Sequence, residues 1–257
     1  MIMKSFFMSM FTTSCLLMPS IAFAAPKVEE VVHIYKKGQV IDFLLLTNKE
    51  NYNKNFNAYR ESFIKPAVEE LGFTTLPSFF VDKNPIQGNI SPDFLAIGTW
   101  KFEGTKNGWK VRDDALEKFM KRVPDLHAQR MRIWSLFNMS LYLIKEDKTF
   151  TTFSDKTYVL TSYWQKDKRK FKRFKKEMLK KIAAANGIVK IEFTDSRSPF
   201  GYAYNPEYTF ISQWQSKAAF EAFLPKSKAM NTSAVKHVNQ FYITHYAPKQ
   251  TRKTTEP

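Results

Sequence analysis

Cysteine is almost absent from this chain of 257 residues, and the single one, Cys15, lies near the N-terminus. If residues 1–24 are removed during export, no thiol remains, which excludes disulfides, thiolate metal sites and cysteine nucleophiles. The chain has 8 glycines, and no glycine-rich phosphate loop, nucleophile elbow or Ser-His-Asp ordering stands out. The sequence therefore gives no indication of a cysteine- or serine-nucleophile hydrolase or of an enzyme with a phosphate-binding loop.

Histidine is also scarce, with four residues in the whole chain. None is spaced for a metal-binding pair on a helix, and no carboxylate lies at a matching interval, so we expect no metal and no cofactor. His33, His127 and His237 are expected at surface or capping positions. His245 is best placed to point inward from a strand, and it is the one candidate for a catalytic, proton-handling group.

The N-terminus has the pattern of a secretory signal peptide. Lys4 supplies a positive charge, an apolar stretch covers 5–21, and the small residues Ala22 and Ala24 stand two positions apart, as signal peptidase requires. An uncleaved anchor is the alternative, although the apolar run is short and broken by Ser and Thr. Cleavage near Ala24 predicts a periplasmic or secreted bacterial protein.

Acidic residues are outnumbered: Lys and Arg total 40 and Asp and Glu total 24, a net charge of +16, which falls to +15 when Lys4 is removed. Nucleic acid is the usual partner for such a charge, but an exported protein meets little of it, so we expect none. Anionic lipid or another envelope polyanion is the partner we expect instead. Solubility alone is the alternative explanation.

The chain repeats itself. The segment PDFLAIGTW at 92–100 returns as PEYTFISQW at 206–214, a shift of 114. An upstream amphipathic pattern returns with a shift of 115, which pairs Phe56, Tyr59, Phe63, Ile64 and Gly72 with Phe171, Phe174, Met178, Leu179 and Gly187. Nearly equal shifts over separate segments indicate two copies of one unit.

Hydrophobic periodicity predicts the same order, strand-helix-strand-strand-helix-strand, in each half. The first half has strands at 40–47, 73–81, 93–102 and 132–144 and helices at 54–71 and 113–129, the latter capped by Asp113 or Asp114. The second half has strands at 157–165, 188–194, 207–215 and 241–246 and helices at 168–186 and from 217, disturbed at Pro225.

This order is the ferredoxin-like βαββαβ arrangement. We predict an α+β fold in which two tandem ferredoxin-like units pack as a pseudo-dimeric α+β barrel, so that the protein is a monomer. The expected organisation is a signal peptide (1–24), an N-terminal arm (25–38), a first unit (39–146), a short charged linker, a second unit (156–247) and a disordered tail (248–257).

The strand-to-helix junction at 209–223 resembles the dimeric α+β barrel superfamily, as a fused tandem repeat. Members often have a strand ending in Trp, then a polar residue, Ser, and a helix with Ala-Phe; Trp214, Ser216, Ala219 and Phe220 fit this pattern. The superfamily includes antibiotic-biosynthesis-type monooxygenases, which need no cofactor. The resemblance implies a substrate cavity between sheet and helices.

The haem-degrading branch of that superfamily uses an Asn on the first strand and a Trp and a His on the second helix. The matching positions here hold Ser162 or Tyr163, Phe223 and Val235. Because this set is absent, the resemblance does not imply haem degradation.

Small residues among large aromatics on the central strands indicate a cavity. We predict that a small apolar or aromatic ligand binds there, with a filled core as the alternative. The candidate ligand-binding residues are Trp100, Ser162, Trp164, Phe210, Ser212 and Trp214.

The helix expected over 168–186 is densely basic on the side opposite its apolar stripe. We predict that this side binds an anionic surface through Lys168, Lys172, Lys175, Lys176 and Lys180, with a solvated exterior as the alternative. The function we predict first is an exported protein that binds a small apolar or aromatic ligand in the barrel. The alternatives are a cofactor-independent monooxygenase of the antibiotic-biosynthesis type and a non-catalytic protein that binds anionic envelope surfaces through the Lys-rich helix.

Overall fold

The computed structural model describes residues 28–50, 52–104, 107–199, 204–230 and 232–246. The predicted signal peptide with Cys15 and the predicted tail at 248–257 lie outside these residues. Within them, no helix is long and apolar enough to cross a membrane.

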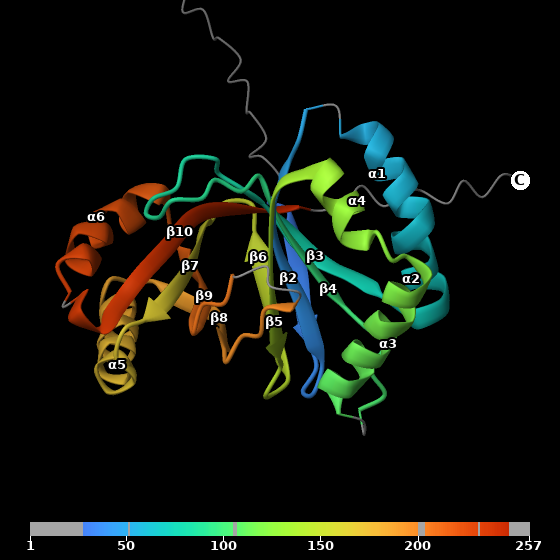
Figure 1. Ribbon diagram of the computed structural model, residues 1–257. Helices are drawn as coiled ribbons and strands as arrows, with labels where there is room; N and C mark the ends of the chain where they lie inside the picture. The colour runs from blue at the N-terminus through green and yellow to red at the C-terminus, as the bar shows by residue number, and fades with distance from the viewer. Residues whose placement is uncertain (1–27, 51, 105–106, 200–203, 231, 247–257) are drawn as a thin grey trace, which may run out of the picture.

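Two units with the same order of elements make up the described chain (Figure 1). The first contains β2 (Val40–Asn48), α1 (Asn53–Tyr59), the π-helical η1 (Arg60–Ile64), α2 (Lys65–Leu71), β3 (Thr74–Val81), β4 (Phe94–Thr99), α3 (Gly108–Arg122), α4 (Leu126–Ile133) and β5 (Trp134–Leu143). The second contains β7 (Thr157–Gln165), α5 (Lys168–Ala184), β8 (Ile188–Thr194), β9 (Tyr208–Trp214), α6 (Lys217–Lys228), the 3-10 turn η3 (Thr232–Ala234) and β10 (Val235–Tyr246).

One eight-stranded antiparallel sheet runs through both units in the order β5-β2-β4-β3-β10-β7-β9-β8. Each half has the ferredoxin-like strand order, and the halves join edge to edge where Ile243 to Tyr246 of β10 pair with Val81 to Ser78 of β3. Helices α1 to α4 cover the outer face of one half, and α5 and α6 cover the other (Figure 1). The predicted α+β class, with two βαββαβ units in a barrel-like arrangement, is confirmed.

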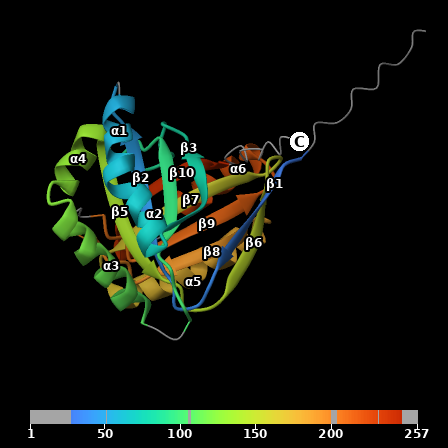
Figure 2. The same ribbon diagram turned by 90° about the vertical axis from the view of Figure 1, so that its right-hand side faces the viewer.

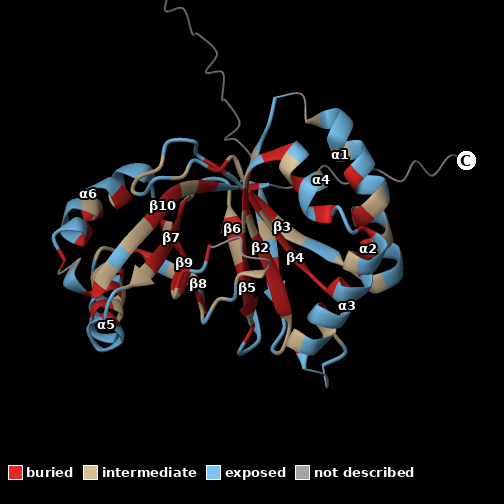
Figure 3. Cartoon of the chain, viewed as in Figure 1, coloured by how far each residue is buried: buried red, intermediate tan, exposed pale blue. Residues whose placement is uncertain are grey.

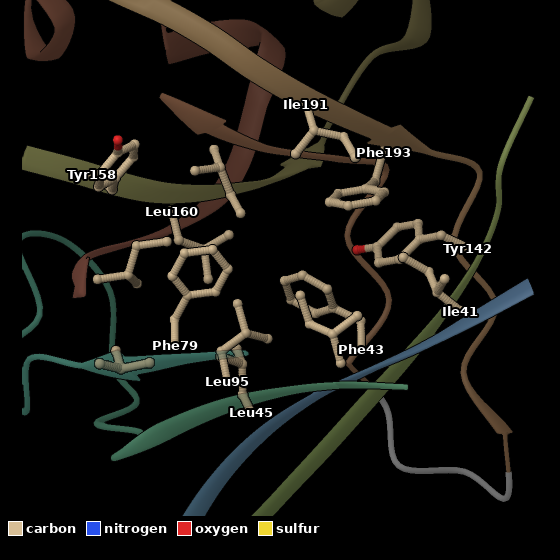
Figure 4. Close-up of a cluster of buried hydrophobic side chains, with 14 of the residues drawn as sticks. Ile41, Phe43, Leu45, Phe79, Leu95, Tyr142, Tyr158, Leu160, Ile191 and Phe193 are labelled. Atoms are coloured by element: carbon tan, nitrogen blue, oxygen red, sulfur yellow. The ribbon is translucent and has the colours of Figure 1, made fainter. Parts of the chain in front are cut away.

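Three hydrophobic cores follow from this arrangement. One lies under the helices of each unit, and the third lies between the inner faces of the two half-sheets. Figure 4 shows this inner core, in which Phe43, Phe79 and Phe193 meet side chains from both units. The interior of the barrel is therefore filled with apolar side chains.

A two-stranded ribbon lies beside the main sheet (Figure 2). It pairs β1 (Glu30–Tyr35), from the segment expected as an arm, with β6 (Lys148–Phe153), from the segment expected as a linker. His33 and Tyr35 are buried, and Tyr35 and Phe150 belong to the inner core. The ribbon thus covers part of the barrel interior.

Several element boundaries differ from expectation. The helix predicted from Asp113 begins at Gly108, and its cap is Asn107, whose Oδ1 accepts the Trp109 N–H at 3.0 Å, rather than Asp113 or Asp114. At Pro66 the chain does not break; a π-helical turn precedes it, because Pro66 lacks the N–H that a regular α-helical ladder needs there. Helix α6 likewise continues through Pro225.

Candidate functional site

The predicted ligand-binding residues of β9 lie under α5 and α6. Phe210 and Trp214 are buried in the second unit's helix-covered core, and Ser212 between them is 2% exposed. The Trp214 Nε1–H donates to Ser212 Oγ at 3.0 Å. The Trp214 ring also packs on Phe223, with ring centroids 4.9 Å apart. The Ser212 hydroxyl in turn donates to the Val159 carbonyl at 3.4 Å, so both polar groups have partners, and aromatic rings fill the space around them.

Ser162 and Trp164 lie on the opposite face of the sheet. The register of β7 against β9 places Ser162 opposite Thr209 and Val159 opposite Ser212. Residues directly opposite one another share a face, so Ser162 points into the barrel with Thr209 and not toward Phe210 or Ser212. The predicted ligand residues of β7 and β9 therefore lie on opposite faces of the sheet.

Trp100 lies in a third place, the helix-covered core of the first unit. Its Nε1–H donates to Asp42 Oδ2 at 3.3 Å, and Arg112 Nε donates to Asp42 Oδ1 at 3.3 Å. The side chains of Asp42 and Arg112 are 6% and 3% exposed. Sequence reasoning missed this buried pair, although an isolated Asp inside the apolar run 40–46 was a visible signal. The six predicted ligand residues therefore do not line one common site.

A polar group that the sequence analysis missed lies inside the barrel. The hydroxyls of Tyr142 and Ser162 each lie 3.0 Å from Thr209 Oγ1. The Tyr204 hydroxyl is buried and has no hydrogen-bond partner in the described part of the chain. Burial raises the pKa of Tyr204 to about 12, against the effect of nearby Ser162 and Asn239. This group places several hydroxyls in a mainly apolar interior.

His245 faces inward as predicted, at 8% exposed, but its proposed catalytic role stays a prediction. His33, which was expected at the surface, is completely buried. Its ring stacks between Phe79 and Phe150, with centroids 5.2 and 4.6 Å away, and its Nε2 lies 3.0 Å from Thr152 Oγ1. Burial lowers the pKa of His33 to about 4, with smaller contributions from His245 and Lys190.

The outer face of α5 carries the predicted anionic-surface residues. Phe171, Phe174, Met178 and Ile182 are buried, which turns the basic side of the helix toward solvent. Lys168, Lys172, Lys176 and Lys180 are all exposed. They follow one another at four-residue spacing, so they form one row about 18 Å long at ~1.5 Å per residue. We call these four residues the lysine row; none makes an ion pair in the described structure.

Lys175 differs from the other four predicted lysines. Its Nζ lies 2.7 Å from Glu192 Oε2 on β8 and 4.0 Å above the centre of the Tyr208 ring. It is half-buried. Lys175 therefore fastens α5 to the sheet and does not belong to the exposed row.

The described part of the surface has a groove on each unit. One, of about 530 Å³, lies on the first unit between α2 and α3 and is lined by charged residues that include Glu70, Lys110 and Asp114. The other, of about 210 Å³, lies between α5 and η3. None of the six predicted ligand residues lines either groove. Among the described residues, no group of three or more His, Cys, Asp or Glu is placed to hold a metal ion.

Comparisons with known proteins identify similar folds only. No family model matches the sequence, and no curated protein matches it. A mutant chlorite dismutase from Candidatus Nitrospira defluvii is 8% identical over 82% of this chain and 93% of its own, with a TM-score of 0.47. A proposed monooxygenase from Lactobacillus acidophilus NCFM is 16% identical over 81% of this chain and 94% of its own, with a TM-score of 0.34.

A heme-binding protein from Thermus thermophilus is 9% identical over 86% of this chain and 93% of its own, with a TM-score of 0.36. The strand order of this chain shows the two joined βαββαβ units directly, and these similarities, with TM-scores between 0.34 and 0.47, add no support to it. The closer resemblance to antibiotic-biosynthesis monooxygenases, and the origin of the two units by duplication, stay predictions.

Proposed function

We propose that this protein is a non-catalytic interaction protein that binds anionic lipid surfaces through the outer face of α5. The observation that carries the proposal is the lysine row, in which four exposed lysines follow one another at four-residue spacing and none forms an ion pair with a carboxylate in the described structure. The proposal includes export: after removal of residues 1–24 the protein acts in the bacterial envelope, where anionic lipid is abundant.

The lysine row is unfavourable for the isolated helix. Like charges at four-residue spacing destabilise a helix by ~0.2–0.5 kcal/mol per pair, and the row contains three such pairs. The first turn of α5 adds Arg169 and Lys170 at the positive end of the helix dipole, where the one carboxylate is that of the capping residue Asp167, whose Oδ1 accepts the Lys170 N–H at 2.7 Å. An external anionic surface would offset this repulsion.

Helix α3 of the first unit shows how this chain builds an ordinary solvated helix. There Lys110 lies 2.8 Å from Asp114, and Lys121 lies 2.8 Å from Glu117, both at four-residue spacing. On the described residues of α5 only one such pair is present, between Glu177 and Lys181. A surface with interleaved charges of both signs is sufficient for solubility. Solubility alone therefore does not account for the lysine row, in which all the charges are positive.

The expected mode of binding is peripheral. The apolar stripe of α5 is occupied by the second unit's core, so the helix contributes charge and no apolar insertion. Each basic residue near an anionic membrane contributes ~1 kcal/mol, an attraction that acts within about one Debye length and weakens with salt.

Binding of a small apolar or aromatic ligand inside the barrel is the second candidate function. The observation that favours it is the buried, unpartnered Tyr204 hydroxyl beside Ser162. Against it, the interior is filled (Figure 4), and both described grooves open on the outer surface. The third hypothesis is cofactor-independent monooxygenation. It needs the same interior space as ligand binding, and it ranks below the ligand-binding hypothesis.

The test is sedimentation of residues 25–257 with phosphatidylglycerol-containing vesicles, at low and high salt. The variant Lys172→Glu/Lys176→Glu is expected to lose at least tenfold in binding. A matched variant, Lys54→Glu/Lys118→Glu, makes the same change of net charge at exposed sites of the first unit and is expected to bind nearly as the parent does. Equal losses in both variants, or binding that survives high salt, would contradict the proposal.

A further inference from the structure

We propose that the groove between α5 and η3 binds a phosphate monoester group of a lipid headgroup. This inference rests on the proposed function, because it names the lipid class that the basic face prefers. The groove has a volume of about 210 Å³ and is lined by Lys170, Arg173, Phe174, Glu177, Ser233 and Ala234.

The lining has the composition of an anion site. Lys170 and Arg173 are exposed cations that make no ion pair in the described structure. Phe174 and Ala234 are 7% and 3% exposed, so the groove has a packed, apolar floor. A guanidinium presents a planar fork of N–H donors that matches phosphate oxygens, and an ammonium adds a point charge.

These residues favour a monoester over a diester. A phosphate monoester carries a charge of about −1.5 to −2 at neutral pH and three terminal acceptor oxygens. A phosphodiester carries one negative charge and has two free oxygens. Two cations beside a small groove are better matched in charge by the monoester, so a headgroup that ends in phosphate is the expected occupant.

The groove opens beside the lysine row. At ~100° per residue, Arg173 lies about 20° around the helix from Lys180 and about 60° from Lys176. Arg173 therefore shares a side of α5 with Lys176 and Lys180, the C-terminal half of the row. Lys168 and Lys172 lie about 140° and about 100° around the helix from Arg173. A headgroup held by Arg173 lies at the edge of the surface that the C-terminal half of the row faces. The row supplies attraction to any anionic bilayer, and the groove supplies the preference among headgroups.

Glu177 is the one lining residue that opposes an anion. Its carboxylate lies 3.2 Å from Lys181 Nζ, four residues later, which partly neutralises it. Removal of this charge should strengthen phosphate binding, which provides a gain-of-function test that misfolding cannot mimic.

The first experiment compares vesicles that contain phosphatidic acid with vesicles that contain phosphatidylglycerol, at equal surface charge. The parent protein is expected to bind phosphatidic acid several-fold more tightly. Arg173→Gln should abolish this preference, whereas Arg169→Gln, an exposed arginine one turn earlier that does not line the groove, should weaken binding to both lipids equally.

The second experiment measures Glu177→Gln against Glu117→Gln. Both glutamates are paired with a lysine four residues later on an exposed helix face, so the two changes are equal in charge and in the pair removed. Only Glu177→Gln should raise the preference for phosphatidic acid, by about two- to fivefold. A similar rise in Glu117→Gln would overturn the inference.

The outcomes separate the two proposals. Tight binding to both lipids without preference overturns the phosphate groove and leaves the anionic-surface function intact. No binding to either vesicle overturns the anionic-surface function and the lipid source together. Inorganic phosphate, titrated by NMR while the Ser233 and Ala234 amides are followed, then decides whether the groove takes the free ion instead of a headgroup.

Discussion

The helix-covered cores of the two units have the same topology and opposite chemistry. In the first unit, Asp42, Arg112 and Arg130 are buried, and the Arg130 guanidinium lies over the rings of Phe63 and Phe137 at 5.1 and 4.9 Å. Among the described residues of the second unit, no Asp, Glu, Lys or Arg is buried, and aromatic rings dominate its core. Its charges lie outside, on α5, where the outer residues are exposed (Figure 3).

This difference shows that helices can be attached to the sheet of a βαββαβ unit in two ways: by a buried, hydrogen-bonded charge pair or by apolar packing. In the first unit, a hydrogen-bonded charge pair connects β2 to α3, so helix and strand are fixed by specific partners. In the second unit, packing attaches α5, together with the Lys175–Glu192 pair at its margin. Since α5 needs nothing from its outer face, that face is available for a surface partner.

The largest expected effect tests the first unit. Asp42→Ala leaves Arg112 buried without its partner, and we expect the free energy of unfolding to fall by ~3–5 kcal/mol. Asp113→Ala removes an exposed carboxylate 3.7 Å from the same guanidinium and should change stability by less than ~1 kcal/mol. Chemical denaturation followed by circular dichroism measures both.

The double variant Asp42→Leu/Arg112→Met serves as the control. Because it removes both charges together, most of the lost stability should return. A deficit of ~1–3 kcal/mol should remain, because the buried Trp100 Nε1–H loses its acceptor. Equal effects of Asp42→Ala and Asp113→Ala on the free energy of unfolding would contradict this prediction. The buried Asp42–Arg112 pair would then not be a stabilising feature that separates the first unit from the second.

Much of the fold was predictable from the sequence because it depends on periodicity. Strands β7 and β8 match their predicted bounds completely, since both are continuous runs rich in β-branched and aromatic residues. Several boundaries were wrong: β10 begins at Val235, six residues before the predicted 241, and other errors involve proline and polar caps. Asn107 begins α3 five residues early, and α6 continues past Pro225, because tertiary packing outweighs the lost hydrogen bond.

The candidate site was less predictable because it depends on pairing between strands. Alternation along each strand placed Ser162 and Ser212 on correct faces of their own strands but did not reveal that Ser162 opposes Thr209. The burial of His33 follows from the pairing of β1 with β6, two segments that were expected as an arm and a linker. Helical periodicity was enough to place the four exposed lysines of the row, but it did not separate them from Lys175, which pairs with Glu192 on β8. Binding of an anionic surface by the row stays a prediction.

The next largest effect concerns the inner core that both units share. His33 is neutral in the folded protein, because burial, with His245 and Lys190 nearby, lowers its pKa from 6.5 to about 4. Its contribution to stability is therefore complete above about pH 6.5 and is lost as the pH falls toward 4. The loss amounts to at most ~3 kcal/mol at ~1.4 kcal/mol per pKa unit.

His33→Phe isolates this contribution, because a phenyl ring can keep the stack between Phe79 and Phe150. Urea denaturation at three pH values between neutrality and the pKa of about 4 should show the variant gaining stability relative to the parent as the pH falls. If the stabilities of the parent and of His33→Phe change with pH in parallel, the acid sensitivity arises from carboxylates of the individual units. The inner core that both units share would then not be the acid-sensitive part of the molecule.

The smallest expected effect tests the second unit. Lys172→Glu replaces two like-charge contacts in the lysine row, with Lys168 and Lys176, by two attractive ones, and we expect a stabilisation of ~1 kcal/mol. The same substitution should weaken binding to anionic vesicles about tenfold. Lys118→Glu in the first unit places a carboxylate four residues after Asp114, so stability there should stay level or fall slightly. A gain in stability together with a loss of vesicle binding in Lys172→Glu would show that the row is kept for its partner and not for the fold. A loss of stability with unchanged vesicle binding would show that α5 is an ordinary solvated helix, like α3.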